Sequence, residues 1–365
     1  MWTPEQQQRL RHRLLDWYGQ QGRDLPWRHT RDPYAIWVSE IMLQQTQVTT
    51  VLPYFQRWLE QLPHIQDLAV AAPAQVLKLW EGLGYYRRAR YLQQAAQQLV
   101  AERQGVFPTT LEEAMGLPGI GRTTAAGILS AAFDRPLPIL DGNVKRILAR
   151  LGALPVPPRR ATRQLWQWSE TLLDRQHPRD FNQALMDLGA LICRPRQPHC
   201  RECPWQEDCT AYNHRQQDHY PMSEPTPPRP HKTIAVAVVW QGEQLLIDQR
   251  LESSMLGGLW EFPGGKIEEG ETAAECVVRE VKEEIGIDVV VESALTTIDH
   301  AYSHFTITLI AFICRYVAGE ARALQCSDVR WIYPSQLSEY AFPSANQKLF
   351  PALYEWLNTQ SSSTS

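Results

Sequence analysis

The most constraining feature of this sequence is a tight glycine turn between two predicted helices. Gly119 and Gly121 flank one apolar residue within the segment Leu117–Ala125. Glycine allows close backbone approach, so the bare N–H groups of such a turn can contact a phosphate. An isolated Gly-x-Gly is more often an ordinary turn between helices, so the surrounding residues decide between the two interpretations.

A carboxylate follows this turn at a defined distance. Asp141 lies twenty residues after Gly121 and precedes a second predicted helix, Asn143–Arg150. It can serve as an N-cap, or it can be an unpaired carboxylate that faces a ligand at the helix N-terminus. The whole segment resembles the helix-hairpin-helix DNA glycosylases. The resemblance implies that Asp141 is catalytic and that Gly119, Gly121 and Asn143 contact DNA.

A second segment with a candidate catalytic carboxylate supports the same family. Asp32 followed by Pro33 predicts a helix start, and the helix is expected to continue to Thr46. Glu40 lies among apolar residues of this helix, where partial desolvation would favour the protonated acid and suit a general acid. A surface glutamate on an amphipathic helix is the alternative. The string Ser39–Gln47 resembles the catalytic helix of the MutY-type adenine glycosylases.

The segment Gly82–Arg90, after a predicted helix Pro73–Trp80, contains two glycines, two adjacent tyrosines and three arginines. Aromatic rings can replace lost base stacking in a distorted duplex, although core tyrosines would give the same pattern. The resemblance implies that Gln45 and Tyr85 wedge into the base stack. It also implies that Arg28 lies near the extruded base.

Thr123 occupies an informative position. In related glycosylases that also cleave the strand, the corresponding residue is a lysine that attacks the sugar as an amine nucleophile. Threonine cannot form that Schiff base, so we predict a monofunctional glycosylase. MutY-type relatives carry tyrosine or serine here, so the side chain's contacts with DNA are not defined by the resemblance.

Four of the seven cysteines lie within seventeen residues. Cys193, Cys200, Cys203 and Cys209 are separated by six, two and five residues, which gives only one Cys-x-x-Cys pair. A zinc ribbon normally has two such pairs, so the spacing favours a [4Fe–4S] cluster. It equals the spacing of the iron–sulfur loop in the glycosylase family.

The charge is distributed unevenly along the 365 residues. Residues 1–220 contain 26 Lys and Arg against 21 Asp and Glu, whereas residues 221–365 contain 10 against 19. A basic half suits a polyanion and an acidic half suits divalent cations. With no signal peptide and no long apolar run, we expect a cytoplasmic, nucleoid-associated monomer without a membrane partner.

A second domain follows a proline-rich stretch. Five of the ten residues in 221–230 are proline, which predicts a stiff extended linker. The segments Ile234–Val239 and Gln244–Ile247 are expected to be strands. A capping box at Thr272 and Glu275 begins a helix that Gly286 ends.

That helix carries Glu280, Glu283 and Glu284 on one predicted face, where like charges repel unless a cation such as Mg²⁺ offsets them. The segment Gly265–Ile287 resembles an intact Nudix box. Further resemblance to MutT implies that Arg250 and Asn346 hold a nucleotide such as 8-oxo-dGTP. Tyr302, Ser303 and His304 instead resemble the MutY-type loop that contacts 8-oxoguanine in DNA.

We therefore predict a multidomain chain, with an all-α helix-hairpin-helix glycosylase domain and an α/β (α+β) Nudix domain. The predicted parts are the glycosylase domain 1–192, the iron–sulfur loop 193–211, the linker 212–230, the Nudix domain 231–356 and a disordered tail 357–365. The expected substrate is duplex DNA with adenine opposite 8-oxoguanine or guanine. A thymine or uracil mismatch glycosylase, or a glycosylase with a second Nudix pyrophosphohydrolase activity, is the alternative.

Overall fold

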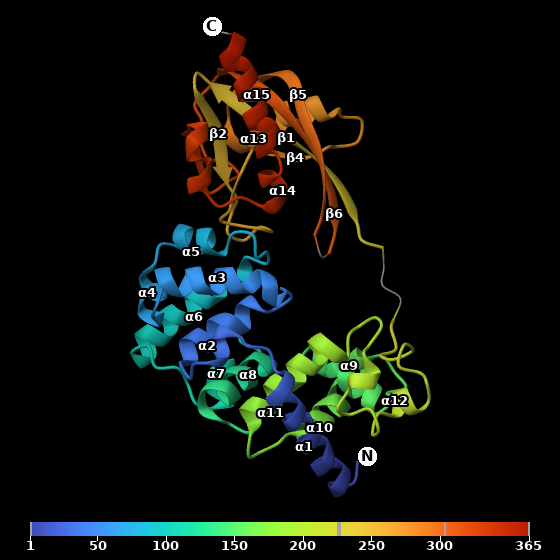
Figure 1. Ribbon diagram of the computed structural model, residues 1–365. Coiled ribbons are helices and arrows are strands. Elements are labelled where there is room, and N and C mark those ends of the chain that lie inside the picture. The colour runs from blue at the N-terminus through green and yellow to red at the C-terminus, as the bar shows by residue number, and fades with distance from the viewer. Residues whose placement is uncertain (1, 225–227, 303, 364–365) are drawn as a thin grey trace. The chain divides into compact units, whose positions relative to one another are not determined.

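The computed structural model describes residues 2–224, 228–302 and 304–363. By its Cα packing the chain divides into two compact units (Figure 1). The first comprises Met1–Val70 and Tyr91–Thr226, and the second comprises Ala71–Arg90 and Pro227–Ser365. Among the described residues, no helix combines the length and apolar character needed to cross a bilayer.

Every regular element described in the first unit is a helix. The α-helices are α1 (Pro4–Gln21), α2 (Pro33–Met42), α3 (Val48–Gln61), α4 (Ile65–Val70), α6 (Arg87–Arg103, which begins in the second unit), α7 (Leu111–Met115), α8 (Arg122–Phe133), α9 (Gly142–Leu151), α10 (Thr162–Leu172), α11 (Pro178–Asp187) and α12 (Thr210–Asn213). Shorter turns of helix are η1 (Pro26–Arg28), η2 (Pro158–Ala161), η3 (Leu188–Ile192) and η4 (Cys200–Glu202).

The helix starts follow the local sequence. Asp32 caps α2 by accepting hydrogen bonds from the N–H groups of Tyr34 at 3.0 Å and Ala35 at 3.3 Å. The predicted continuation of this helix to Thr46 is wrong, because α2 ends at Met42. The backbone of Gln45 has a φ of 58°, which a right-handed helix does not accommodate.

The second unit contains a mixed sheet. Its strands are β1 (His231–Gln241), β2 (Gln244–Gln249), β3 (Trp260–Glu261), β4 (Gly264–Lys266), β5 (Asp288–Ala301), β6 (Thr306–Ala318) and β7 (Asp328–Ile332). The spatial order is β3-β2-β1-β6-β5, with β4 paired to β1 and β7 paired to β2. The β1–β6 pair is parallel and the other pairs are antiparallel. Its helices are α5 (Pro73–Trp80), η5 (Pro334–Glu339), α13 (Ala273–Ile285), α14 (Ser344–Gln347) and α15 (Phe350–Ser363).

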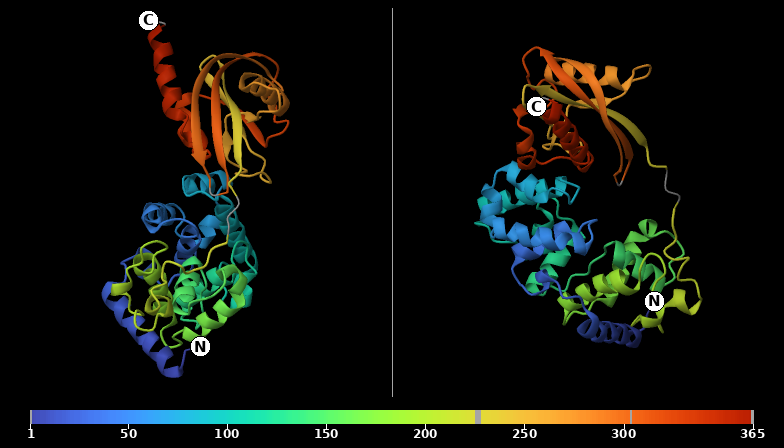
Figure 2. Two further views of the ribbon diagram at one scale, coloured as in Figure 1. Left: turned by 90° about the vertical axis from the view of Figure 1, so that its right-hand side faces the viewer. Right: turned by 45° about the horizontal axis from the view of Figure 1, so that its top comes forward.

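Helices cover both faces of this sheet (Figure 2). Side chains of α13 such as Val277 and Val281 pack on one face with Leu246, whereas Leu349 and Leu353 pack on the other with Leu245. The capping box at Thr272 is present, and Gly286 ends α13 in the left-handed region with a φ of 85°. Helix α15 runs through residue 363, so it includes most of the segment predicted as a tail.

Candidate active site

Two carboxylates of the first unit occupy the predicted catalytic positions. Glu40 lies near the end of α2, and Asp141 is the N-cap of α9. One oxygen of Asp141 accepts a hydrogen bond from the Val144 N–H at 2.7 Å, and the other accepts one from the Asn143 amide at 3.2 Å. Asp141 therefore caps its helix and is held in one orientation by the same bonds.

Glu40 is half-buried rather than exposed on a helix surface. Burial, and then the charge of Asp141, raise the pKa of Glu40 to about 7. A Cβ on Gly127 of α8 would lie 3.0 Å from Glu40 Oε2, so this glycine makes room for the carboxyl group. The pKa of Asp141 is also raised by burial, but its hydrogen bonds and Arg146 act in the opposite direction. The pair thus places an acid that is protonated near neutral pH beside a hydrogen-bonded carboxylate.

Arg28 belongs to a buried ion-pair network that sequence reasoning did not find. Its guanidinium donates two hydrogen bonds to Asp187, both at 2.8 Å, and a third to Gln183 Oε1 at 2.9 Å. Burial raises the pKa of Asp187, but the donors on Arg28 and Arg23 more than offset this, so the pKa lies below its ordinary value. Arg28 also lowers the pKa of Glu40, which opposes the effect of burial. No helical periodicity or motif singled out Gln183 or Asp187.

The glycine turn has the conformation that its sequence requires. Gly119 has a φ of 76°, and a Cβ there would lie 2.8 Å from the Cβ of Tyr91. Gly121 is the N-cap of α8 and has no side-chain capping bond. Thr123 turns inward, because its hydroxyl donates to the carbonyl of Leu140 at 3.3 Å. The two glycines therefore present backbone atoms, rather than side chains, at the tip of the turn.

Both predicted wedge residues have left-handed backbones. Gln45 has a φ of 58° and Tyr85 a φ of 47°, conformations that cost free energy for residues other than glycine. Within the second unit the Tyr85 ring lies against that of His304, with centroids 6.4 Å apart. The rings of Tyr302 and Phe305 stack, with their centroids 4.8 Å apart. Ser303 lies outside the described residues.

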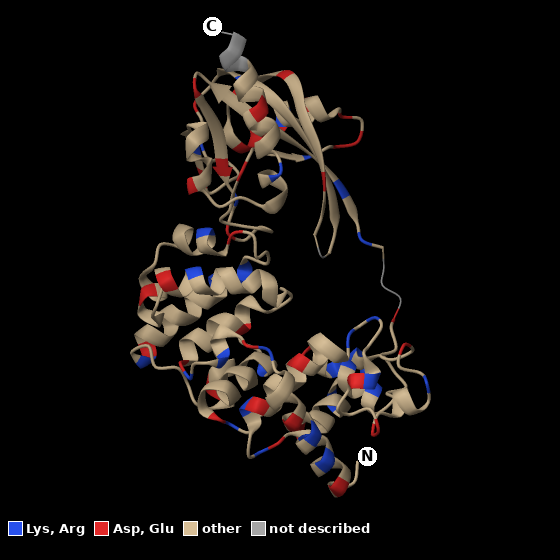
Figure 3. Ribbon diagram, viewed as in Figure 1, with Lys and Arg blue, Asp and Glu red and all other residues tan. Residues whose placement is uncertain are grey.

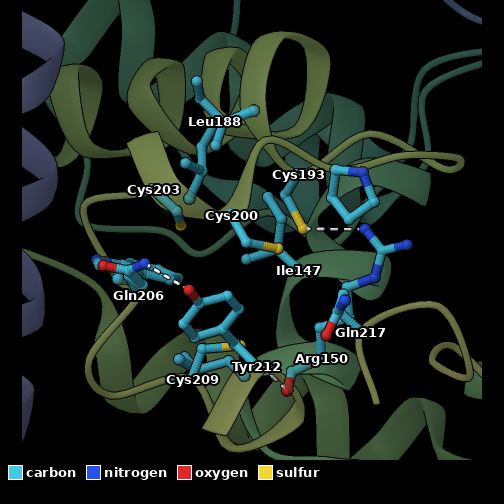
Figure 4. A pocket seen from close by; sticks show the side chains of 14 residues that line it. Ile147, Arg150, Leu188, Cys193, Cys200, Cys203, Gln206, Cys209, Tyr212 and Gln217 are labelled. Carbon is cyan, nitrogen blue, oxygen red and sulfur yellow. Dashed lines mark hydrogen bonds between the residues drawn. The ribbon is translucent and has the colours of Figure 1, made fainter. Parts of the chain in front are cut away.

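Four cysteines line one cavity of about 30 Å³ in the first unit (Figure 4). Burial raises the pKa of Cys203 to about 12 and that of Cys209 to about 11. Arg150 donates to the sulfur of Cys193 at 3.4 Å. Among the described residues, no three Cys, His, Asp or Glu side chains gather closely enough to form a ready metal cage. The four cysteines fit a cluster in donor type and in their location around one cavity.

The predicted acidic face of α13 is partly neutralised within the protein. Arg279 forms ion pairs with Glu271 at 2.8 Å, Glu280 at 3.0 Å and Glu283 at 3.4 Å. Glu284 instead accepts a hydrogen bond from the Gly264 N–H at 3.3 Å, and burial raises its pKa to about 8. The glutamate-rich loop before α13 adds further negative charge (Figure 3).

The predicted nucleotide contacts are engaged within the domain. Arg250 forms an ion pair with Glu261 of β3. Asn346 is 4% exposed, and its Oδ1 accepts a hydrogen bond from the Phe262 N–H at 3.2 Å. A guanine edge would therefore have to compete with a backbone amide for this oxygen.

Comparison with known proteins identifies the family. A model described as the HhH-GPD superfamily of base excision DNA repair proteins matches residues 38–171, and a NUDIX domain model matches residues 235–352. An adenine DNA glycosylase of Mus musculus is 34% identical over 95% of this chain and 78% of its own length. The chain belongs to the adenine DNA glycosylases. The human adenine DNA glycosylase is likewise 34% identical, over 93% of this chain and 73% of its own.

Solved structures support the fold of the glycosylase part. A thermostable thymine-DNA glycosylase aligns with a TM-score of 0.53 and 29% identity, covering 57% of this chain and 97% of that chain. An endonuclease III structure trapped on DNA aligns with a TM-score of 0.51 and 21% identity, covering 59% and 99%. The curated relatives and the two family models together show an adenine DNA glycosylase of base excision repair, which hydrolyses N-glycosyl bonds and carries a Nudix domain. The predicted family and the multidomain fold are confirmed.

Proposed function

We propose that this adenine glycosylase removes adenine opposite 8-oxoguanine or guanine in duplex DNA, with Glu40 and Asp141 as its catalytic groups. The observation that carries the proposal is the placement of the half-buried Glu40 near the end of α2 and of Asp141 at the N-cap of α9. Burial, and then the charge of Asp141, raise the pKa of Glu40 to about 7. The test is a comparison of adenine with thymine and uracil excision on matched duplexes. The proposed setting is a cytoplasmic monomer acting on chromosomal DNA.

The two groups have different roles. Adenine must leave the base stack before a protein group can reach it, at a cost of a few kcal/mol. Glu40 then protonates adenine N7, which makes the base a better leaving group, while Asp141 stabilises the positive charge that develops on the sugar. Once the base has left, Glu40 is a carboxylate and accepts a proton from the attacking water.

The DNA-facing residues hold a distorted duplex. The backbone of Gly119 and Gly121, with Asn143, contacts phosphate, while Gln45 and Tyr85 enter the stack from their left-handed backbones. A strained backbone is common where a side chain is held ready for binding. Four further residues complete the set: Arg28 beside the extruded adenine, and Tyr302, Ser303 and His304 beside 8-oxoguanine.

The position of Thr123 predicts an intact abasic strand as product. Borohydride should trap no covalent complex between the wild-type protein and DNA, because a hydroxyl that donates to Leu140 O is not an amine nucleophile. Thr123→Lys should gain weak trapping and strand cleavage, both visible on a denaturing gel. Efficient trapping by the wild type would require another amine and would contradict the proposal.

We propose that Cys193, Cys200, Cys203 and Cys209 bind a [4Fe–4S] cluster that stabilises the surrounding loop. Cys203→Ser should abolish the broad visible absorbance of the purified protein and weaken duplex affinity, because the loop then loses its anchor. Cys276→Ser is the matched control, since that buried cysteine lies in the second unit. One equivalent of zinc and no iron in the wild type would overturn the assignment.

The Nudix domain has a second candidate function, hydrolysis of 8-oxo-dGTP to the monophosphate and pyrophosphate. The observation that favours it is the carboxylate set of α13, in which Glu280, Glu283 and Glu284 are all present and suit Mg²⁺. Arg250 and Asn346 would hold the nucleotide after exchanging their present partners. We expect pyrophosphate release with Mg²⁺ from the wild type and none from Glu283→Gln/Glu284→Gln. If neither the wild type nor the variant hydrolyses 8-oxo-dGTP, the candidate hydrolase function is excluded. Recognition of 8-oxoguanine is then the proposed function of the domain.

A further inference from the structure

The turn between α5 and α6, which carries Tyr85, has a strained backbone. Gly82, Gly84 and Tyr85 have left-handed conformations, with φ values of 97°, 69° and 47°. Glycine adopts this region readily, whereas a residue with a Cβ adopts it at a cost in free energy. Contacts from neighbouring residues must therefore hold Tyr85 in this conformation.

Arg88, in the first turn of α6, contacts the carbonyl groups on both sides of Tyr85. Its Nη2 donates hydrogen bonds to the oxygens of Leu83 at 3.0 Å and Gly84 at 3.1 Å. Its backbone N–H donates to the Tyr85 oxygen at 2.8 Å. The Gly84 carbonyl belongs to the planar peptide unit that precedes Tyr85, so fixing its direction also restrains the φ of Tyr85. Because the side-chain donor is charged, these bonds are stronger than those of a neutral donor.

The guanidinium group of Arg88 also faces two aromatic rings. Its central carbon lies 5.1 Å from the centroid of the Trp80 ring and 5.6 Å from that of the Tyr85 ring. A cation at this distance is attracted to the face of a ring. The indole N–H of the buried Trp80 donates to the Gly84 oxygen at 3.0 Å, which ties the same carbonyl to the core. Arg88 therefore links the turn, the Tyr85 ring and a core tryptophan.

The outer end of the Tyr85 side chain has no comparable anchor. Its hydroxyl oxygen is buried and has no hydrogen-bond partner in the part of the chain that the structure describes. Its ring touches that of His304 edge-on, with centroids 6.4 Å apart. The direction of the ring is therefore set mainly at its base, by the backbone that Arg88 holds.

We propose that Arg88 is a positioning residue, which holds the turn so that the Tyr85 ring is ready to enter the base stack. This inference rests on the proposed wedge role of Tyr85. Arg88 acts through Tyr85 and does not itself read a base. A wedge that is ordered before DNA arrives avoids part of the entropy cost of binding.

The test uses the full-length protein and a fluorescent duplex. The duplex carries 8-oxoguanine opposite 2′-fluoro-2′-deoxyadenosine, because the fluorine disfavours positive charge on the sugar and keeps the adenine in place. 2-Aminopurine next to 8-oxoguanine brightens when a wedge separates it from its neighbour. The emission is read at saturating protein, so that a change in affinity alone does not alter it.

We expect Arg88→Met, which keeps the apolar stem but removes the donors, to lower the emission change by about fivefold or more. Arg88→Lys restores the charge without the planar guanidinium and should recover part of the change. Arg103→Met, an exposed position in the last turn of α6, is the matched control and should behave as the wild type does. Loss without recovery in a folded Arg88→Lys, or a full change in Arg88→Met, would overturn the proposal.

Tyr85→Ala separates this inference from the function on which it rests. If Tyr85→Ala loses the emission change while Arg88→Met keeps it, the wedge role stands and the positioning role is wrong. If Tyr85→Ala keeps the change, the wedge role is wrong and the positioning role falls with it. Should Arg88→Met fail to fold, as thermal unfolding would show, the full wild-type change in Arg88→Lys would contradict the proposal and a partial one would support it.

Discussion

Glu40→Gln is expected to lower the single-turnover rate of adenine release by about 10²–10⁴-fold, the range that general acid catalysis supplies. Duplex affinity should stay at the wild-type level, because glutamine keeps the volume that Gly127 accommodates. Glu102→Gln, a change at an exposed position of α6, is the matched control and should leave the rate unchanged. Substantial single-turnover activity in Glu40→Gln would remove this residue from the mechanism.

The same residue predicts how the rate depends on pH. Burial and the neighbouring Asp141 raise the pKa of Glu40 to about 7, so the protonated acid dominates below that pH. The single-turnover rate of the wild type should therefore fall as the pH rises through about 7. A rate that rises over this interval would indicate that the ionised form of Glu40 limits the reaction.

Asp141→Asn is expected to lower the same rate by about 10²–10³-fold, because asparagine carries no charge to oppose the one that develops on the sugar. Asparagine caps a helix as well as aspartate does, so the hydrogen bond from Val144 and the thermal stability should persist. Asp32→Asn, at the N-cap of α2, makes the same chemical change and should leave excision intact. If both variants lose activity together with stability, Asp141 acts only as a cap.

Sequence reasoning found the features whose chemistry is local. A cap at Asp141, the turn at Gly119 and the capping box at Thr272 each depend on a few adjacent residues, and the structure contains all three. The left-handed backbone at Gln45 was missed, because no glycine marks it.

Features that depend on segments far apart in the sequence could not be predicted from local sequence patterns. The bonds from Arg28 to Asp187 join residues 159 positions apart, and no periodic pattern connects them. Similarly, Arg279 forms ion pairs with Glu271, Glu280 and Glu283, which relieve the repulsion predicted along α13 without a metal. Glu284 does not belong to this set of ion pairs. The pairing of β1 with β6 likewise depends on register across the chain rather than on either strand's own sequence.

The most direct measurement of the central claim is single-turnover base excision on four matched duplexes, which contain adenine opposite 8-oxoguanine, adenine opposite guanine, thymine opposite guanine and uracil opposite guanine. We predict that adenine is released from the first two duplexes, that thymine and uracil stay in place, and that Glu40→Gln and Asp141→Asn release no base at a comparable rate. Release of thymine or uracil as fast as adenine, or unchanged adenine release by both variants, would contradict the account.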